Sequence, residues 1–169
     1  MALLVLEALS KEAFAPFGEV IEIEGSDWFP INNGSTQRYH KLGMVEVLGE
    51  GGYPAISMAR GAAFDFPLSI NMLERHPLGS QSFIPCNGVP FIVVVAPSLP
   101  NGMPDERGLR AFHVRADQGV NYRSGCWHHP LISLGKEGDF IVVDRVGSGH
   151  NCDEVVLSTG YRIEAANSP

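Results

Sequence analysis

The sequence predicts an all-β domain, either a sandwich or a barrel, with one short helix near the N-terminus. Short apolar runs recur along the chain, and Gly, Pro or Asn separates each run from the next. The 19 glycines and 12 prolines are spread throughout rather than gathered in one linker, which is typical of many short elements. No repeat, low-complexity block or shift in composition marks a boundary, so we expect a single domain over residues 1–169.

The helix is expected at residues 11–17, where Ser10 can cap the first turn and Gly18 can end the last one. The clearest strand is Phe91–Ala96, which is apolar at every position, as in a strand covered on both faces. Alternating or β-branched runs predict further strands around residues 20–23, 44–48, 55–58, 81–85, 111–114, 127–134, 140–144, 155–157 and 161–163.

Composition excludes several classes of protein. Hydrophobic residues make up 44% of the chain and charged residues 18%, so a core can form and a disordered chain is excluded. The net charge of -7 and the lack of a basic cluster argue against a nucleic-acid partner. The apolar N-terminal run stops at Glu7, and no run reaches the roughly 20 residues of a membrane helix. We expect a cytoplasmic protein with no membrane partner, whose three cysteines form no disulfide framework.

Three polar segments could form a site. The first contains Asn32, Asn33 and Gly34 followed by Arg38, and Asn-Asn-Gly is a turn signal because these residues accept positive φ. It is either a surface turn or a loop whose amides and Arg38 hold a small polar ligand.

The second segment places Glu74 and His76 two residues apart, so in a strand both side chains project from the same face. Gln81 follows a Pro-Leu-Gly-Ser turn and could join them from the neighbouring strand. A carboxylate, an imidazole and an amide oxygen together make a plausible shell for a divalent metal. The alternative is an exposed Glu–His pair before a turn.

The third segment contains the adjacent histidines His128 and His129. Neighbours in a strand point to opposite faces, so at most one of the two should enter any single site. The alternative for either residue is a hydrogen-bonded structural histidine.

The second and third segments resemble the two cupin motifs. Glu74-x-His76 with Gln81 is similar to the first motif, in which two histidines flank one residue and a carboxylate follows in the next strand. Gly125-Cys126-Trp127-His128 is similar to the second motif, in which two residues separate a Gly from the last histidine ligand. Glu74 takes the place of the first histidine, Gln81 that of the glutamate and Arg123 that of the usual proline. The resemblance implies a cupin-like β-barrel of the jelly-roll type, with metal ligands Glu74, His76, Gln81 and His128.

A wider resemblance runs from the N-terminus nearly to Asp153. The chain resembles the ureidoglycolate lyase family of allantoin degradation in the blocks FPINNG at 29–34, RYH at 38–40, LERHPLGSQ at 73–81, QGVNY at 118–122, WHHPL at 127–131 and FIVVDR at 140–145. The resemblance implies a homodimer that splits (S)-ureidoglycolate into glyoxylate and urea in purine catabolism. It also implies a divalent metal, with nickel the first choice.

Such a cleavage needs a base for the carbinol proton and an acid or Lewis acid near the departing urea. His76, His128 and Glu74 are the candidates for these catalytic roles. The substrate carboxylate needs a clamp, which an Arg guanidinium suits through its bidentate fork. Strand alternation turns Arg75 away from Glu74, so we expect the substrate to be bound by residues from other segments, namely Asn32, Asn33, Arg38, Arg60 and Asn121.

Two other functions remain open at the level of sequence. One is a non-catalytic cupin that binds a small molecule, which would not turn over ureidoglycolate. The other is a ureidoglycolate amidohydrolase, which would release ammonia instead of urea.

Overall fold

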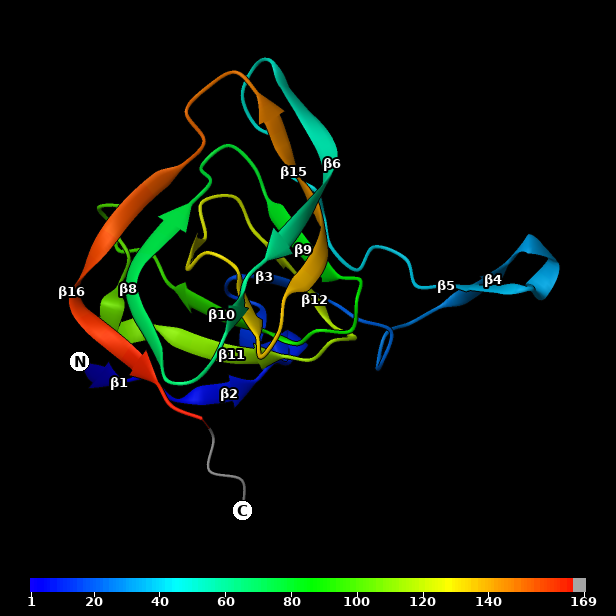
Figure 1. Ribbon diagram of the computed structural model, residues 1–169. Helices are drawn as coiled ribbons and strands as arrows, with labels where there is room; N and C mark the ends of the chain where they lie inside the picture. The colour runs from blue at the N-terminus through cyan, green and yellow to red at the C-terminus, as the bar shows by residue number, and fades with distance from the viewer. Residues whose placement is uncertain (166–169) are drawn as a thin grey trace.

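The computed structural model describes residues 1–165, which form two facing β-sheets and a hairpin that stands apart from them (Figure 1). The larger sheet contains, in order across it, β1 (Ala2–Leu3), β16 (Asp153–Ile163), β8 (Leu68–Arg75), β13 (Trp127–His128), β10 (Phe91–Ala96), β11 (Arg110–Val114) and β2 (Leu6–Ala8), and β14 (Ile132–Leu134) joins β10 to β7 (Ala63–Phe64). The smaller sheet contains, in order, β3 (Gly18–Ile21), β12 (Gly119–Tyr122), β9 (Gln81–Pro85), β15 (Gly138–Gly147) and β6 (Gly52–Gly61).

The predicted all-β architecture with a short N-terminal helix is confirmed, and most of its strands form two facing sheets. Two single-turn helices, η1 (Asn32–Gly34) and η2 (Glu106–Gly108), complete the elements. The last four residues of the expected domain lie outside the described part of the chain. Within residues 1–165, no helix is both long and apolar enough to cross a membrane.

The helix, α1 (Lys11–Phe14), begins as expected but ends early. The side chain of Ser10 accepts a hydrogen bond from the backbone N–H of Ala13, so the predicted cap is confirmed. Pro16 has no backbone N–H and cannot continue the hydrogen-bond ladder, which is why the helix does not reach residue 17. Phe14 is fully buried and packs edge-on against Phe112, which anchors the helix on the core.

Strand β10 lies at the centre of the molecule and is buried at all six positions, as its sequence predicts. Phe91, Val93 and Val95 face the space between the two sheets, where Phe140 of β15 meets Phe91 at a ring distance of 5.1 Å. Ile92 and Val94 face a second apolar cluster formed within the curved larger sheet. Burial on both faces fixes the central strand, and the strands that carry the polar site are registered against it.

Several expected strands differ in extent. Pro130 separates the expected 127–134 strand into β13 and β14, because proline removes a donor from the ladder. The two C-terminal strands are one, β16, with an irregularity between Val156 and Tyr161. Residues 44–48 form no strand; they cross the outer face of the smaller sheet, joined to it by a bridge between Val47 and Gly79.

The hairpin of β4 (Phe29–Ile31) and β5 (Thr36–Arg38) projects far from the body of the protein (Figure 1). Its strands pair with each other and with no further strand of the described chain. Asn32 and Asn33 lie at its tip with φ of 52° and 55°, the left-handed conformation that the Asn-Asn-Gly sequence indicates. We refer to residues 28–41, which comprise this hairpin and its flanking residues, as the arm.

Candidate functional site

Two neighbouring strands of the larger sheet bring a carboxylate and two imidazoles together. Glu74 of β8 is paired in register with His128 of β13, so both side chains lie on one face of the sheet. The Oε1 atom of Glu74 is 3.5 Å from Nε2 of His128 and 3.9 Å from Nε2 of His76. The two imidazole centroids are 5.3 Å apart. One donor atom from each of these three residues lies within 4.8 Å of the others, and we call them the triad.

Backbone carbonyls fix the orientation of both imidazoles. Nδ1 of His76 lies 2.8 Å from the carbonyl of Asn151, and Nδ1 of His128 lies 2.9 Å from the carbonyl of Cys126. A carbonyl only accepts, so in each neutral ring the proton is assigned to Nδ1 and the lone pair to Nε2. Both Nε2 atoms are buried and meet no hydrogen-bond partner in the described chain. Each therefore presents an unused lone pair toward Glu74.

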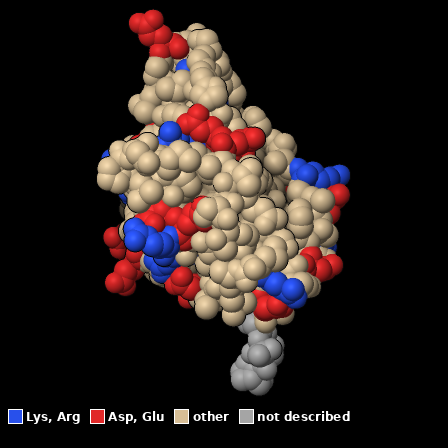
Figure 2. All heavy atoms as spheres, turned by 90° about the vertical axis from the view of Figure 1, so that its left-hand side faces the viewer, with Lys and Arg blue, Asp and Glu red and all other residues tan. Residues whose placement is uncertain are grey.

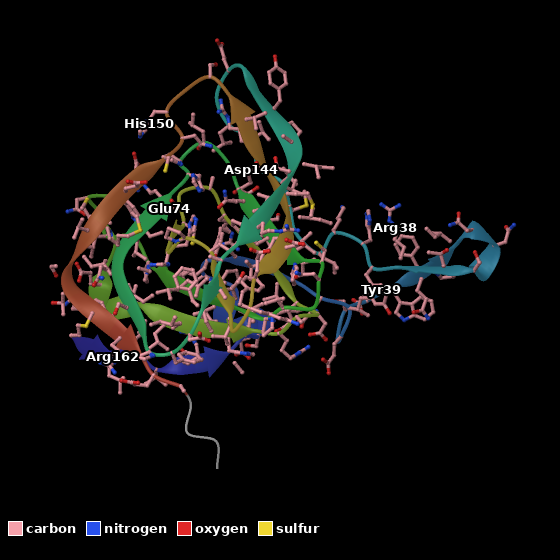
Figure 3. The ribbon with its side chains drawn as sticks, in the orientation of Figure 1. Arg38, Tyr39, Glu74, Asp144, His150 and Arg162 are labelled. Carbon is pink, nitrogen blue, oxygen red and sulfur yellow. The ribbon has the colours of Figure 1, made fainter. Side chains whose placement is uncertain are left out.

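Gln81 contributes a third unused acceptor from the facing sheet. Its Nε2 donates to Oδ2 of Asp144 at 3.2 Å, which leaves the amide oxygen as the free atom. That oxygen is buried and has no hydrogen-bond partner within residues 1–165. Glu74 and Asp144 are labelled in Figure 3 at the same end of the body.

Tyr122 connects the two sheets at this end. It is paired in register with Gln81, so both side chains lie on the same face of the smaller sheet. Its ring stacks on the ring of His128 with centroids 4.1 Å apart and an interplanar angle of 13°. Tyr122 thus contacts His128 and is the register partner of Gln81, which is consistent with the expected association of Gln81 with the triad. Sequence reasoning missed Tyr122, although it lies next to Asn121 in a segment already singled out.

The Glu74 carboxyl is partly buried, with 20% of its side chain exposed. The neighbouring His128 lowers the pKa of Glu74, with smaller contributions from His76 and His129, while burial acts in the opposite direction. This lowering operates when His128 carries a proton on Nε2, from which it can donate to Glu74, because a lone pair facing the carboxylate would not stabilise the anion. Glu74 is consequently an anion at neutral pH, which suits a metal ligand.

His129 is outside the triad. Its Nδ1 lies 2.9 Å from the carbonyl of Pro130, and burial lowers the pKa of its imidazole. Arg75 also faces away from Glu74, as strand alternation predicts. Its guanidinium pairs with Asp153 at 2.8 Å and lies over the ring of Trp127.

The structure brings none of the five expected substrate-binding residues to the triad. Arg60 pairs with Asp139 at 2.7 Å on the outer face of the smaller sheet, five positions along β15 from Asp144, or roughly 17 Å. Asn121 points to the face opposite Tyr122, where its amide binds Ser82, Glu19 and the carbonyl of Met44. The other three, Asn32, Asn33 and Arg38, lie on the projecting arm (Figure 3).

A second group of donors adjoins the triad. Glu154 of β16 is paired in register with Glu74, and donor atoms of these two residues and Cys152 lie within 4.8 Å of one another. Cys152 is exposed, and burial together with Glu74 raises the pKa of its thiol. Cys152 and Glu154 are both exposed; we call this side of the triad its entrance, and it is acidic because Glu74 and Glu154 lie there.

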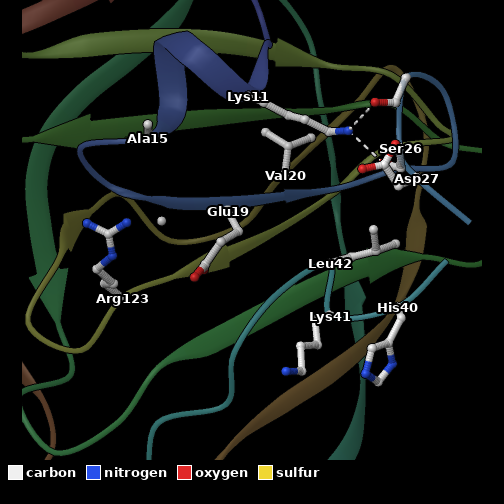
Figure 4. A pocket seen from close by; sticks show the side chains of 12 residues that line it. Lys11, Ala15, Glu19, Val20, Ser26, Asp27, His40, Lys41, Leu42 and Arg123 are labelled. Atoms are coloured by element: carbon white, nitrogen blue, oxygen red, sulfur yellow. Dashed lines mark hydrogen bonds between the residues drawn. The ribbon is translucent and has the colours of Figure 1, made fainter.

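A separate hollow of about 440 Å³ lies beside the helix and strand β3 (Figure 4). Lys11 donates to Oγ of Ser26 at 2.6 Å on its rim, and no triad residue lines it. Its charges partly cancel, because Glu19 and Asp27 stand among Lys11, Lys41 and Arg123. Figure 2 likewise shows basic and acidic side chains interspersed on another face, with no continuous basic patch there.

With this geometry in view, comparison with known proteins identifies the family. The family model described as ureidoglycolate lyase matches residues 1–164. The chain belongs to the ureidoglycolate lyase family. A ureidoglycolate lyase of Stutzerimonas stutzeri is 56% identical over 163 residues, which cover 96% of this chain and 95% of that protein. One from Pseudomonas putida is 56% identical over 154 residues, or 91% of either chain. The family predicted from the sequence blocks is confirmed.

A more distant similarity is to solved structures of Bacillus subtilis oxalate decarboxylase. One has a TM-score of 0.34 and 16% sequence identity, and the match covers 66% of this chain and 29% of that one. At this distance the similarity carries no argument about metal or reaction in the present ureidoglycolate lyase family member.

The donor set of the triad fits a divalent metal. An anionic carboxylate and two imidazole lone pairs converge, and each imidazole is oriented through Nδ1 by a carbonyl, as is usual behind metal-ligating histidines. The Gln81 oxygen is a further buried acceptor without a partner in the described chain. Imidazole and carboxylate ligands suit several divalent ions, so the donors alone do not select nickel.

Proposed function

We propose that this protein is a ureidoglycolate lyase that cleaves (S)-ureidoglycolate to glyoxylate and urea during allantoin degradation. Full-length family membership supports the reaction, and the triad supplies the groups that it needs. The single observation that carries the site assignment is the pair of buried, unpartnered Nε2 atoms of His76 and His128. Buried polar atoms are rarely left without a partner in a native protein, which indicates that a ligand completes them.

In the reaction, the bond between the carbinol carbon and the ureido nitrogen breaks as the carbinol oxygen becomes the carbonyl of glyoxylate. The hydroxyl proton must pass to a base, and the departing nitrogen must receive a proton to leave as urea. Nε2 of His76 or His128 can take the first proton when it does not ligate a metal, because the carbonyls of Asn151 and Cys126 hold the other ring nitrogen protonated.

Glu74, His76, His128 and Gln81 would hold a divalent metal, which when bound would supply Lewis acidity at the substrate oxygens. Tyr122 would keep the His128 ring in place by stacking. Asp144 would fix the Gln81 amide by accepting a hydrogen bond from its Nε2, which leaves the amide oxygen free to bind the metal. Nickel is our first choice of ion. Metal analysis of the purified protein, followed by reconstitution with nickel, manganese or zinc, tests that choice.

We also propose a homodimer. Strand β6 is an edge strand of the smaller sheet, and its outward side chains Ile56 and Met58 are 80% and 65% exposed. Met44 and Val45, on the segment that crosses the same face, are 57% and 46% exposed. Exposed apolar area of this kind commonly marks a contact with another chain. Light scattering at working concentration tests the assembly, and a monomer mass would contradict it.

The activity is tested by quantifying both products from purified protein and ureidoglycolate, with and without chelator. Equal amounts of urea and glyoxylate support the lyase. Ammonia in place of urea would indicate an amidohydrolase, and no turnover with any of the reconstituted metals would indicate a binding protein. The cytoplasmic location stays a prediction from the sequence, which cell fractionation tests.

A further inference from the structure

The substrate of the proposed lyase carries a carboxylate, yet no Lys or Arg in the described chain forms an ion pair with the triad. Three arginines bind other groups: Arg75 pairs with Asp153, Arg60 pairs with Asp139, and Arg145 donates to the backbone carbonyls of Leu48 and Ser148. The carboxylates nearest the triad, including Glu154, make its entrance acidic. Apart from a bound metal, an anion approaching this entrance meets no Lys or Arg that pairs with the triad in the described chain, and Arg123 lines the hollow beside β3 instead.

The arm has the opposite character. Residues 28–41 include Arg38, His40 and Lys41 and contain no Asp or Glu. Arg38 is exposed and forms no ion pair with any carboxylate in the described part of the chain. Trp28 and Phe29, at the start of the arm, are 49% and 45% exposed. An isolated two-stranded hairpin is at best marginally stable in water, so an arm of this kind needs a surface to lie on.

We propose that the arm of one copy of the chain lies across the triad entrance of a second copy and places Arg38 there to bind the substrate carboxylate. The inference rests on the proposed function and on the proposed dimer, and it adds the residue that the partner contributes. The sign of charge supports it, because a basic arm meets an acidic entrance.

Apolar surface also supports a second copy as the occupant. The arm exposes Trp28 and Phe29, and the outer face of β6 on the body exposes Ile56 and Met58. In a two-fold dimer the arm of each copy can cover the outer face of β6 in the other copy. In this arrangement Arg38 can bind substrate, as the sequence predicts, even though it lies away from the triad of its own chain (Figure 3).

Mixed dimers test the trans arrangement. Arg38→Ala alone should lower kcat/KM about 10- to 100-fold, mostly through KM, which is the size expected for losing a charge-assisted hydrogen bond. His76→Ala alone should be inactive. When the two variants are co-expressed, about half of the dimers are mixed, and each mixed dimer has one complete site, so activity should recover to about a quarter of wild type.

Recovery no greater than the sum of the two parents would overturn the trans arrangement, and so would wild-type kcat/KM in Arg38→Ala. Arg107→Ala is the matched control, because this arginine is 88% exposed and within residues 1–165 pairs only with the nearby Asp105. When Arg107→Ala is co-expressed with His76→Ala, all activity should come from sites with an intact His76, which occur in the Arg107→Ala homodimers and in the mixed dimers. A wild-type protein that releases no urea would instead contradict the proposed function.

Cross-linking tests the arm's position independently of activity. Gln37→Cys, in a Cys86→Ser background, places a thiol on the exposed arm, and the native Cys152 lies exposed beside Glu74. A short bismaleimide should produce a covalent dimer on a denaturing gel, and Cys152→Ser should abolish it. A product that stays monomeric would overturn the proposed position of the arm even if the enzyme is active.

Discussion

Replacing each of the three neighbouring histidines by alanine separates catalysis from packing. His76→Ala and His128→Ala should each lower turnover by about 10²–10⁴-fold, because each removes a base or a metal ligand from the triad. His129→Ala should leave turnover near normal, because its imidazole is outside the triad and binds the carbonyl of Pro130.

The loss of stability in the three variants should not parallel their loss of turnover. His128→Ala removes the stack on Tyr122, worth about 0.5–1.5 kcal/mol, and leaves the buried carbonyl of Cys126 without a donor, worth about 1–3 kcal/mol. We therefore expect a loss of about 2–4 kcal/mol in the free energy of unfolding, which a domain stable by about 5–15 kcal/mol can absorb. His76→Ala and His129→Ala each leave one carbonyl without a donor but remove no stack on Tyr122, so the loss should be smaller, at about 1–3 kcal/mol.

The assay is the rate of urea and glyoxylate release, measured after each variant has been shown to be folded by thermal unfolding. Inactive His129→Ala beside near-normal His76→Ala and His128→Ala would refute the site. Full activity in all three variants would show that the imidazoles are structural.

Three further outcomes follow from the geometry around the triad. Asp144→Ala should weaken metal retention about 10- to 100-fold by freeing the Gln81 amide to rotate, as outer-shell changes typically do, and metal titration would show no change if Gln81 is not a ligand. Tyr122→Leu should lower the free energy of unfolding by about 1–3 kcal/mol and lower turnover as well, whereas a change in stability alone would mean that the stack on His128 has no positioning role. The pKa of Glu74 is depressed below 4.5, so its ionised form stabilises the folded state above about pH 4.5, and this contribution is lost as pH falls through the folded pKa. Wild type should therefore lose melting temperature relative to Glu74→Gln on acidification, and parallel curves would contradict the direction of the shift.

Local periodicity, together with the resemblance to the cupin motifs, predicted which side chains come together in the triad. The two-residue spacing of Glu74 and His76 places them on one side of the sheet, and alternation separates His128 from its neighbour His129. It also predicts that Arg75 faces away, which the structure confirms. These predictions succeed because they depend only on strand geometry within one short segment.

Predictions that required knowing which face of a strand points into the molecule were less successful, and neither Asn121 nor Arg60 lies at the triad. Asn121 and Tyr122 alternate, and either could face the site on sequence grounds; the pairing of Tyr122 with Gln81 decides it. Arg60 has an acidic partner 79 positions away in the sequence, and such a pairing depends on strand register that the local sequence does not specify. The projection of the arm is likewise a property of the assembled chain rather than of its turn sequence.

The acceptors that orient both triad imidazoles are peptide carbonyls, at Asn151 and Cys126, and no side-chain substitution can delete a peptide carbonyl. The proton positions of the site are thus encoded in the path of two loops. Substitution of the loop side chains should leave the orientation of the His76 and His128 imidazoles intact. Insertion or deletion of a single residue at 124–126 or 149–152 should abolish it. Loop length, more than residue identity, is then the quantity that an engineer of this enzyme must preserve.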